Sequence, residues 1–177
     1  MKKIVRYFSL FIINHFLCGT HFWVIKRLLL KIAGIHTGNN VKVVGPIYIK
    51  SQASLSIGNQ TWIGEKFTVA GNGNVYIGNH CDISSDVIFS TGTHKIACSN
   101  RRAGKGYCEN IRVGDGCWIG IRSTILSGVN IGDGVVIAAC SCVNRDVNNN
   151  LVVGGVPSHK IRNLEVESEN INSNSLI

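Results

Sequence analysis

The stretch Val113-Gly114-Asp115-Gly116-Cys117-Trp118-Ile119-Gly120 starts a pattern in which an aliphatic residue returns at every sixth position. The pattern continues through Ile125, Ile131, Ile137 and Val143. Upstream, the same spacing runs through Ile57, Ile63 and Val69 and, after a slip of two residues, through Ile77, Ile83 and Phe89. Neither an α-helix nor an ordinary strand has a period of six. A repeat of this length indicates a solenoid.

Each six-residue unit also has a regular internal composition. Its second residue is often glycine, as at Gly114 and Gly120, and its fifth is small or β-branched, as at Cys117 and Ser123. One large and one small inward residue suit a short strand followed by a corner. Three units make one coil, and stacked coils pair at about 4.8 Å per layer. The sequence therefore predicts a mainly β protein, a parallel β-solenoid whose handedness the period does not fix.

The composition fits a single domain with reduced thiols. The chain has 177 residues, of which 45% are apolar, enough for one core. Its seven cysteines include no CxxC pair, so a cytoplasmic location is expected. A lone C-x-C at Cys140 and Cys142 is weak evidence for zinc, and no metal is expected.

The positive charge is concentrated at the N-terminus. The formal net charge is +8, and residues 1–64 hold eight of the eighteen cations and no Asp or Glu. Apolar runs lie among these cations, but Arg6, Asn14, His15 and His21 disfavour a transmembrane helix. Two interpretations stay open: helices that only cap the solenoid, and helices that also contact an anionic membrane surface peripherally. Nucleic-acid binding is disfavoured because no reader motif accompanies the cations.

The pattern divides the chain into three parts. Residues 1–34 are expected to be helical, and residues 35–157 to form the solenoid, with irregular first coils at 35–56. The spacing stops at residues 95–112, which predicts an external loop; loops of this length are usually functional or disordered. Residues 158–177 are expected to form a short C-terminal helix and, after Leu164, a disordered tail rich in Asn, Ser and Glu.

His94 lies where this external loop leaves the solenoid. A neutral imidazole at such a position could accept a proton from a hydroxyl group near pH 7. From its position alone, a single loop histidine is more often structural or merely exposed.

Four segments together resemble one known family. They are Ile77-Gly78-Asn79-His80-Cys81-Asp82-Ile83, Thr91-Gly92-Thr93-His94, the opening stretch at 113–120, and Val152-Val153-Gly154-Gly155-Val156-Pro157 with Ile161-Arg162. In order and spacing they resemble the hexapeptide-repeat acyltransferases, over roughly residues 35–164. The resemblance implies a left-handed β-helix, a homotrimer, acetyl-CoA as co-substrate and active sites between adjacent subunits.

The resemblance also implies roles for particular residues. His94 is at the position of the family's general base, and Trp118 at that of a wall of the cleft, although an exposed aromatic at a subunit interface would look the same. The implied donor-binding residues are Gly120, Ile121, Ala139, Asn144, Arg145, His159, Lys160 and Arg162. The chain departs from the family's usual Pro-Ala-Lys, since Pro157-Ser158-His159 precedes Lys160; the contact to the CoA phosphates would then be displaced by one residue or weaker.

The acceptor is expected near the slip in the pattern at 71–74. The family places an acidic or amide side chain there, which makes Asn72 the first candidate and Asp82 the second. The alternative for Asn72 is that it only supplies a turn conformation.

The resulting prediction is transfer of an acetyl group to a sugar hydroxyl, in biosynthesis of a surface polysaccharide. The alternative is O- or N-acetylation of a soluble nucleotide-linked amino sugar, simple glycoside or antibiotic. Serine acetyltransferase is disfavoured because the helical segment is too short. A zinc hydratase of the γ-carbonic anhydrase type needs three converging histidines, and a non-catalytic scaffold leaves His94, Trp118 and the long loop unexplained.

Overall fold

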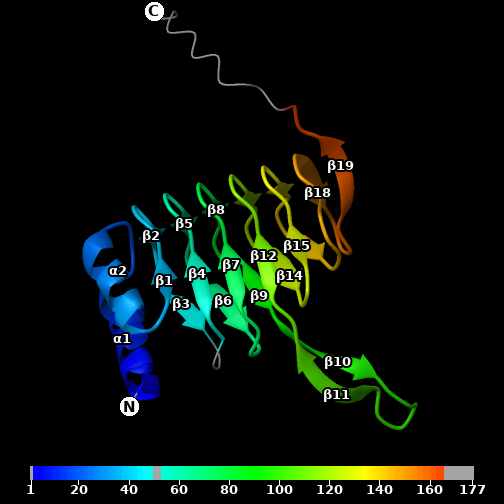
Figure 1. Ribbon diagram of the computed structural model, residues 1–177, viewed down its shortest axis with the longest axis horizontal. Helices are drawn as coiled ribbons and strands as arrows, with labels where there is room; N and C mark the ends of the chain where they lie inside the picture. The colour runs from blue at the N-terminus through cyan, green and yellow to red at the C-terminus, as the bar shows by residue number, and fades with distance from the viewer. Residues whose placement is uncertain (1, 50–52, 166–177) are drawn as a thin grey trace, which may run out of the picture.

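The computed structural model describes residues 2–49 and 53–165, which form a β-solenoid with two helices at its N-terminal end (Figure 1). Five successive coils each contribute a strand to each of three sheets, called A, B and C here, and β18 continues sheet B beyond them, so the solenoid is three-sided. The strands pair in parallel along the stack, with one antiparallel exception at the end of sheet B. The predicted solenoid is confirmed.

Sheet A consists of β1 (His36–Thr37), β4 (Leu55–Ile57), β7 (Val75–Ile77), β12 (Ile111–Val113) and β15 (Asn130–Ile131). Sheet B consists of β2 (Lys42–Val43), β5 (Trp62–Ile63), β8 (Asp82–Ile83), β13 (Trp118–Ile119), β16 (Val136–Ile137), β18 (Leu151–Gly154) and β19 (His159–Asn163). Sheet C consists of β3 (Ile47–Ile49), β6 (Phe67–Ala70), β9 (Ile88–Ser90), β14 (Thr124–Leu126) and β17 (Cys142–Val143).

The large residues of the repeat point inward and stack on one another. In sheet B, Ile63, Ile83, Ile119 and Ile137 occupy equivalent positions in successive strands, and all are buried. Each coil therefore buries its apolar residues against its neighbours, as a solenoid requires.

The coils differ in length, and the expected irregular segment is regular where it is described. Partners are 20 residues apart between β1 and β4 and between β4 and β7, but 18 apart between β12 and β15. The longer coils carry extra residues at the corner between sheets C and A, such as the turn at 71–74. Because β1, β2 and β3 pair in register with the next coil, the expectation of irregular first coils at 35–56 was wrong for residues 36–49.

A ladder of hydrogen bonds runs along the corner between sheets A and B. The backbone N–H of Asn79 donates to Asp115 Oδ1 (2.7 Å), that of Asp115 to Asp133 Oδ1 (2.8 Å), and that of Asp133 to Asn149 Oδ1 (2.9 Å). Hydrogen bonds from the backbone and side chain of Asn79 lower the pKa of the Asp115 carboxyl group. The recurring Asn and Asp residues therefore satisfy backbone groups at a corner where the strands have ended.

The helices α1 (Lys2–Phe16) and α2 (Trp23–Ile32) cover the open end of the first coil. The buried Lys26 ammonium donates to the carbonyl oxygens of Gly19, Val43 (2.9 Å) and Val44 (3.0 Å), and burial lowers its pKa. Arg27 donates to the carbonyl oxygen of Val41 (3.3 Å). The carbonyl groups of Val41, Val43 and Val44 lie in or beside β2, the N-terminal edge strand of sheet B, where no preceding coil supplies hydrogen-bond donors. Part of the N-terminal charge therefore caps the solenoid.

The expected C-terminal helix is a strand. Residues His159–Asn163 form β19, which pairs antiparallel with β18 and covers the other edge of sheet B. The helix prediction was wrong because the five residues are all exposed and offer no apolar face to bury in a helix, whereas the free edge of β18 offers hydrogen bonds. The tail predicted to be disordered lies outside the described residues from residue 166 onward.

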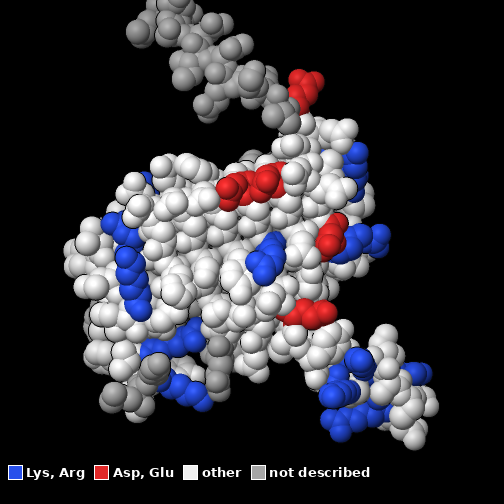
Figure 2. All heavy atoms as spheres, viewed as in Figure 1, with Lys and Arg blue, Asp and Glu red and all other residues white. Residues whose placement is uncertain are grey.

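The external segment is a β-hairpin that projects from the solenoid (Figure 1). Its strands are β10 (Gly92–Ile96) and β11 (Ala103–Cys108), so the segment leaves the coil before residue 95 and has regular structure. Figure 2 shows cations gathered on it, and Lys95, Arg101, Arg102 and Lys105 are all exposed.

Candidate active site

His94 lies on the first strand of the hairpin, at the corner between sheets C and A. The turn at 71–74 lies at the same corner, one coil before the hairpin in the stack. The two interruptions of the six-residue pattern are therefore neighbours in space. Backbone and side-chain hydrogen bonds join them.

Thr91 connects the turn to the hairpin from inside the corner. Its side chain is fully buried; the hydroxyl group donates to the carbonyl oxygen of Ala70 (2.8 Å) and accepts from the N–H of Gly73 (3.0 Å). The carbonyl oxygen of Thr91 accepts from the N–H of Glu109 (3.0 Å) and from the Ser127 hydroxyl group (2.7 Å). Both ends of the hairpin are thus held to the coils before and after it.

Gly106 lies directly across the hairpin from His94. The two residues are paired in the antiparallel register, and a Cβ atom built at Gly106 would lie 3.3 Å from His94 Nε2 and 3.4 Å from Cδ2. A side chain there would crowd the imidazole ring, because contacts this short are rare. The glycine therefore leaves the ring room to lie against the opposite strand, with its nitrogen atoms at the surface.

The structure brings the predicted acceptor residue Asn72 to the base of the hairpin. Its backbone N–H donates to Cys108 Sγ (3.4 Å), and its side chain is exposed. Thr91, Ser127 and Cys108 build this corner but were not singled out from the sequence. Position was a signal for two of them, since Thr91 shortly precedes the interruption at 95–112 and Cys108 lies within it, whereas Ser127 lies in an unbroken part of the pattern.

The second predicted acceptor residue lies elsewhere. Asp82 pairs in register with Trp118, so the two side chains are neighbours on the outer face of sheet B, and Trp118 is 56% exposed. Sheet B is the side of the coil opposite the corner that carries His94. Within one chain, the structure therefore brings Asp82 and Trp118 together but leaves His94 apart from them.

Three of the predicted donor-binding residues lie at the corner between sheets B and C. Gly120 and Ala139 are stacked so closely that a Cβ atom at Gly120 would lie 2.6 Å from the Ala139 nitrogen. The N–H of Cys140 donates to the carbonyl oxygen of Ile121 (2.8 Å), and the N–H of Cys142 to that of Gly155 (2.9 Å). Residues of successive coils thus form a continuous column along this corner, joined by backbone hydrogen bonds.

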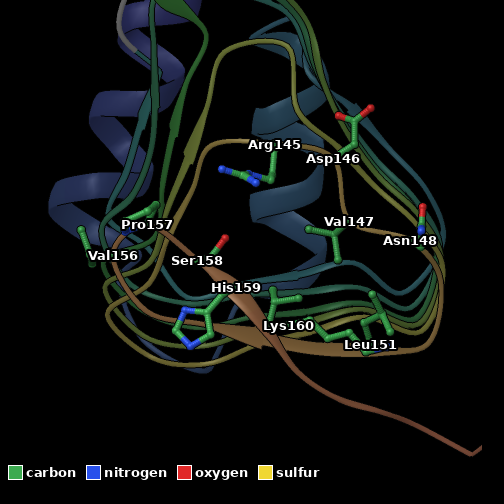
Figure 3. Close-up of a pocket in the computed structure, with 11 residues that line it drawn as sticks. Arg145, Asp146, Val147, Asn148, Leu151, Val156, Pro157, Ser158, His159 and Lys160 are labelled. Carbon is green, nitrogen blue, oxygen red and sulfur yellow. The ribbon is translucent and has the colours of Figure 1, made fainter.

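This column leads to a pocket of about 550 Å³ at the C-terminal end of the solenoid (Figure 3). Arg145, His159 and Lys160 line it together, and Figure 3 shows them around one hollow. A Cβ atom at Gly155 would lie 2.9 Å from His159 Cε1, so the imidazole sits where the column ends. Asn144 precedes Arg145, and Arg162 lies farther along β19; neither lines the pocket.

The arrangement offers an imidazole at one corner and, at the end of another, a pocket lined with cations. Among residues 2–49 and 53–165, no three His, Cys, Asp or Glu side chains gather as a metal site would require. The same residues contain no helix that is long and apolar enough to cross a membrane.

Comparisons with known proteins identify the family of this chain. Residues 110–145 match the family described as bacterial transferase hexapeptide (six repeats). The chain is 32% identical to galactoside O-acetyltransferase of Escherichia coli K12, over 78% of this chain and 68% of that protein. It is 31% identical to the putative colanic acid biosynthesis acetyltransferase WcaF of the same strain, over 81% and 77%. The chain belongs to the hexapeptide-repeat acetyltransferases.

Solved structures show the same fold. A galactoside acetyltransferase in complex with coenzyme A superposes with a TM-score of 0.78 at 28% identity, covering 93% of this chain and 81% of that one. A hexapeptide-repeat acetyltransferase of Vibrio cholerae O1 biovar eltor, complexed with acetyl coenzyme A, has a TM-score of 0.77 at 28% identity, covering 93% and 87%.

Proposed function

We propose that this enzyme transfers an acetyl group from acetyl-CoA to a sugar hydroxyl group of a surface polysaccharide or its precursor, with His94 as the general base. The observation that carries the proposal is the corner at which Thr91 and Ser127 hold the hairpin and place His94 at the surface opposite Gly106. The similarity to WcaF and to a galactoside O-acetyltransferase supports the choice of acceptor.

In the proposed reaction, His94 Nε2 removes the proton of the acceptor hydroxyl group while its oxygen attacks the thioester carbonyl carbon. The C–S bond then breaks, and the imidazolium returns the proton to the thiolate of CoA. General base catalysis of this kind contributes about 10²–10⁴ in rate. Backbone N–H groups at the corners of the coils would stabilise the oxyanion.

The donor is proposed to lie along the column that contains Gly120, Ile121 and Ala139. Its pantetheine arm would use the backbone groups there, and its phosphates would reach Arg145, His159 and Lys160 at the end pocket. Since His159 and Lys160 both line that pocket, the departure from Pro-Ala-Lys still leaves a cation close to the phosphates.

A homotrimer is part of this proposal. Because His94 and the pair Asp82–Trp118 lie on opposite sides of one coil, a site that uses them all needs sheet B of a second copy beside the hairpin. Mass measurement in solution by light scattering tests this: a monomer at assay concentration with full activity would contradict it.

Peripheral contact with an anionic membrane surface at the cytosolic face is also proposed. One face of α1 exposes Ile4, Tyr7, Phe8 and Phe11, at helical spacing and opposite the buried Leu10 and Ile13. The exposed Lys3 and Lys31 accompany this surface, and residues 1–64 contain no acid. Sedimentation with vesicles of anionic and zwitterionic lipid tests it. The same amount of protein in the pellet with anionic vesicles and without vesicles would contradict it.

The test of the catalytic proposal is thiol release from acetyl-CoA with a panel of acceptors. His94→Gln is expected to lower kcat at least 100-fold and to leave CoA binding, measured by calorimetry, unchanged. His80→Gln is the matched control, since His80 is another exposed corner histidine. Near-normal turnover by the His94 variant would refute the assignment. A panel in which only soluble amino sugars or antibiotics are acetylated would refute the polysaccharide acceptor.

A further inference from the structure

All three tryptophans of the chain lie on one side of the molecule. Trp62 and Trp118 occupy the same row of sheet B, with Asp82 between them in register. Trp23, at the start of α2, packs against Trp62, with ring centroids 5.5 Å apart. Figure 1 shows α2 beside β2, with β5 and β8 following along the stack. The catalytic proposal uses only Trp118 among these aromatic residues.

A cavity of about 670 Å³ lies between α2 and sheet B, at the end of this row. Its lining combines the two indole rings of Trp23 and Trp62 with the polar side chains of Gln60, Lys42 and Asp82. Cavities of 300–1,000 Å³ with aromatic walls and a few convergent polar groups are typical of small-molecule sites. Asp82 lines the cavity and also pairs in register with Trp118 in sheet B.

The rings are held in place by the cap of the solenoid. The buried ammonium of Lys26 lies 4.7 Å from the Trp23 ring centroid, and Lys42 Nζ lies 5.9 Å from that of Trp62. Lys26 is itself fixed by backbone carbonyl groups. The contacts of Trp23 with Lys26 and with Trp62 restrict this aromatic wall before any ligand arrives, which lowers the entropy cost of binding.

We infer that this cavity binds a saccharide unit of the acceptor glycan, next to the unit that is acetylated. The C–H face of a pyranose ring is apolar and packs on an indole ring, while its hydroxyl groups need donors and acceptors such as Lys42, Gln60 and Asp82. Trp62 and Trp118 are two strands apart, about 10 Å. A glycan lying along this row would contact Trp62 with one unit and reach the Trp118 cleft with another.

This inference rests on the proposed function, because it assigns a second subsite to the same acceptor. It explains why an enzyme that modifies one hydroxyl group exposes aromatic residues away from His94. It also predicts that the enzyme distinguishes a glycan from a free monosaccharide by binding, not by the chemical step.

The experiment measures binding of saccharides of one to four units. The probes are galactose, galacto-oligosaccharides and oligogalacturonides, titrated into the His94→Gln protein and followed by isothermal titration calorimetry, whose signal does not depend on the tryptophans. Affinity is expected to rise at least tenfold from one unit to three in at least one series. Trp62→Ala should abolish that gain, and Asp82→Asn should reduce it, with CoA affinity unchanged.

Tyr48→Ala is the matched control, because Tyr48 is an exposed aromatic residue on sheet C of the same end of the solenoid. Gln60→Ala adds a variant that leaves the Trp23–Trp62 contact intact if the tryptophan variant fails to fold. Affinity that is independent of chain length in both series, or a gain that survives in Trp62→Ala and Gln60→Ala alike, would overturn the inference. Neither result would affect the His94 assignment, which the loss of turnover in His94→Gln tests separately.

Discussion

Replacing Thr91 by valine should destabilise the protein and displace the hairpin while changing almost nothing in side-chain volume. The hydroxyl group of Thr91 accepts the N–H of Gly73 at 3.0 Å, and Gly73 is buried, so valine leaves that N–H without an acceptor. A buried unsatisfied N–H costs about 1–3 kcal/mol. The carbonyl oxygen of Ala70 loses the hydroxyl donor but still accepts from the backbone N–H of Thr91 (2.8 Å), so it adds little to the loss of stability. The expected loss of unfolding free energy is therefore about 1–3 kcal/mol.

The same substitution should lower activity through the position of His94. Because the turn at 71–74 and the hairpin are joined through Thr91, a loosened corner would misplace the imidazole, and misplacement by about 1 Å can cost 100-fold in rate. We expect kcat to fall at least tenfold with CoA affinity unchanged, since the donor column lies at a different corner.

Urea unfolding at fixed protein concentration and steady-state thiol release measure the two effects. Thr91→Ser is the control: it keeps the hydroxyl group and loses one methyl group, at about 1 kcal/mol. The reasoning is wrong if Thr91→Val unfolds at the wild-type midpoint, or if the serine variant loses as much activity as the valine variant.

Three further outcomes follow from the geometry. Gly106→Val should lower kcat more than Gly106→Ala, because the larger side chain collides with the His94 ring. Equal kcat values for two variants that have the same far-UV circular dichroism spectrum would contradict this. Asp115 has a lowered pKa in the folded state, so its stabilising contribution is present above pH ~4 and is lost as the pH falls through the folded-state value. Asp115→Asn should therefore lose less stability than wild type on acidification, measured by unfolding at pH 7 and pH 3; identical losses would refute it. Hydrogen bonding to Cys81 and burial raise the pKa of the Cys117 thiol, so this buried thiol should react with an aromatic disulfide reagent only after unfolding, in contrast to the exposed Cys98, Cys108 and Cys140. Rapid labelling of Cys117 in the native protein, seen by mass spectrometry, would argue against this.

The regular part of the fold was predictable because each coil repeats the same local rule. An inward aliphatic residue every six positions, with a small residue between, describes the core of residues 57–94 and 113–143, where Ile63, Ile83 and Ile119 are buried as expected. The ends were harder to predict, because an edge strand is determined by the hydrogen bonds it must satisfy and not by its own pattern. Residues 159–163 form β19 for this reason, although their sequence carries no strand signal.

Candidate site residues could be proposed from the sequence, but their spatial arrangement could not. His94 and Asn72 could be found because they lie where the repeat is interrupted. The link through Thr91 needs a contact between residues 18 positions apart, Thr91 and Gly73, which no local pattern contains. The role of Lys26 was also hidden, since a buried lysine and a surface lysine look the same in a basic helix.

The stack of coils also sets a length. Gly120 lies in the coil of β12–β14, and the pocket of Arg145 and Lys160 closes the stack beyond β15–β17. Each coil adds about 4.8 Å along the axis. Inserting one eighteen-residue coil between β14 and β15 would leave every corner contact chemically unchanged, yet move the terminal cations about 5 Å farther from the hairpin. If the donor lies along this column as proposed, a donor of fixed length could then no longer reach from the terminal cations to the hairpin, so the number of coils would set the distance that the donor has to span.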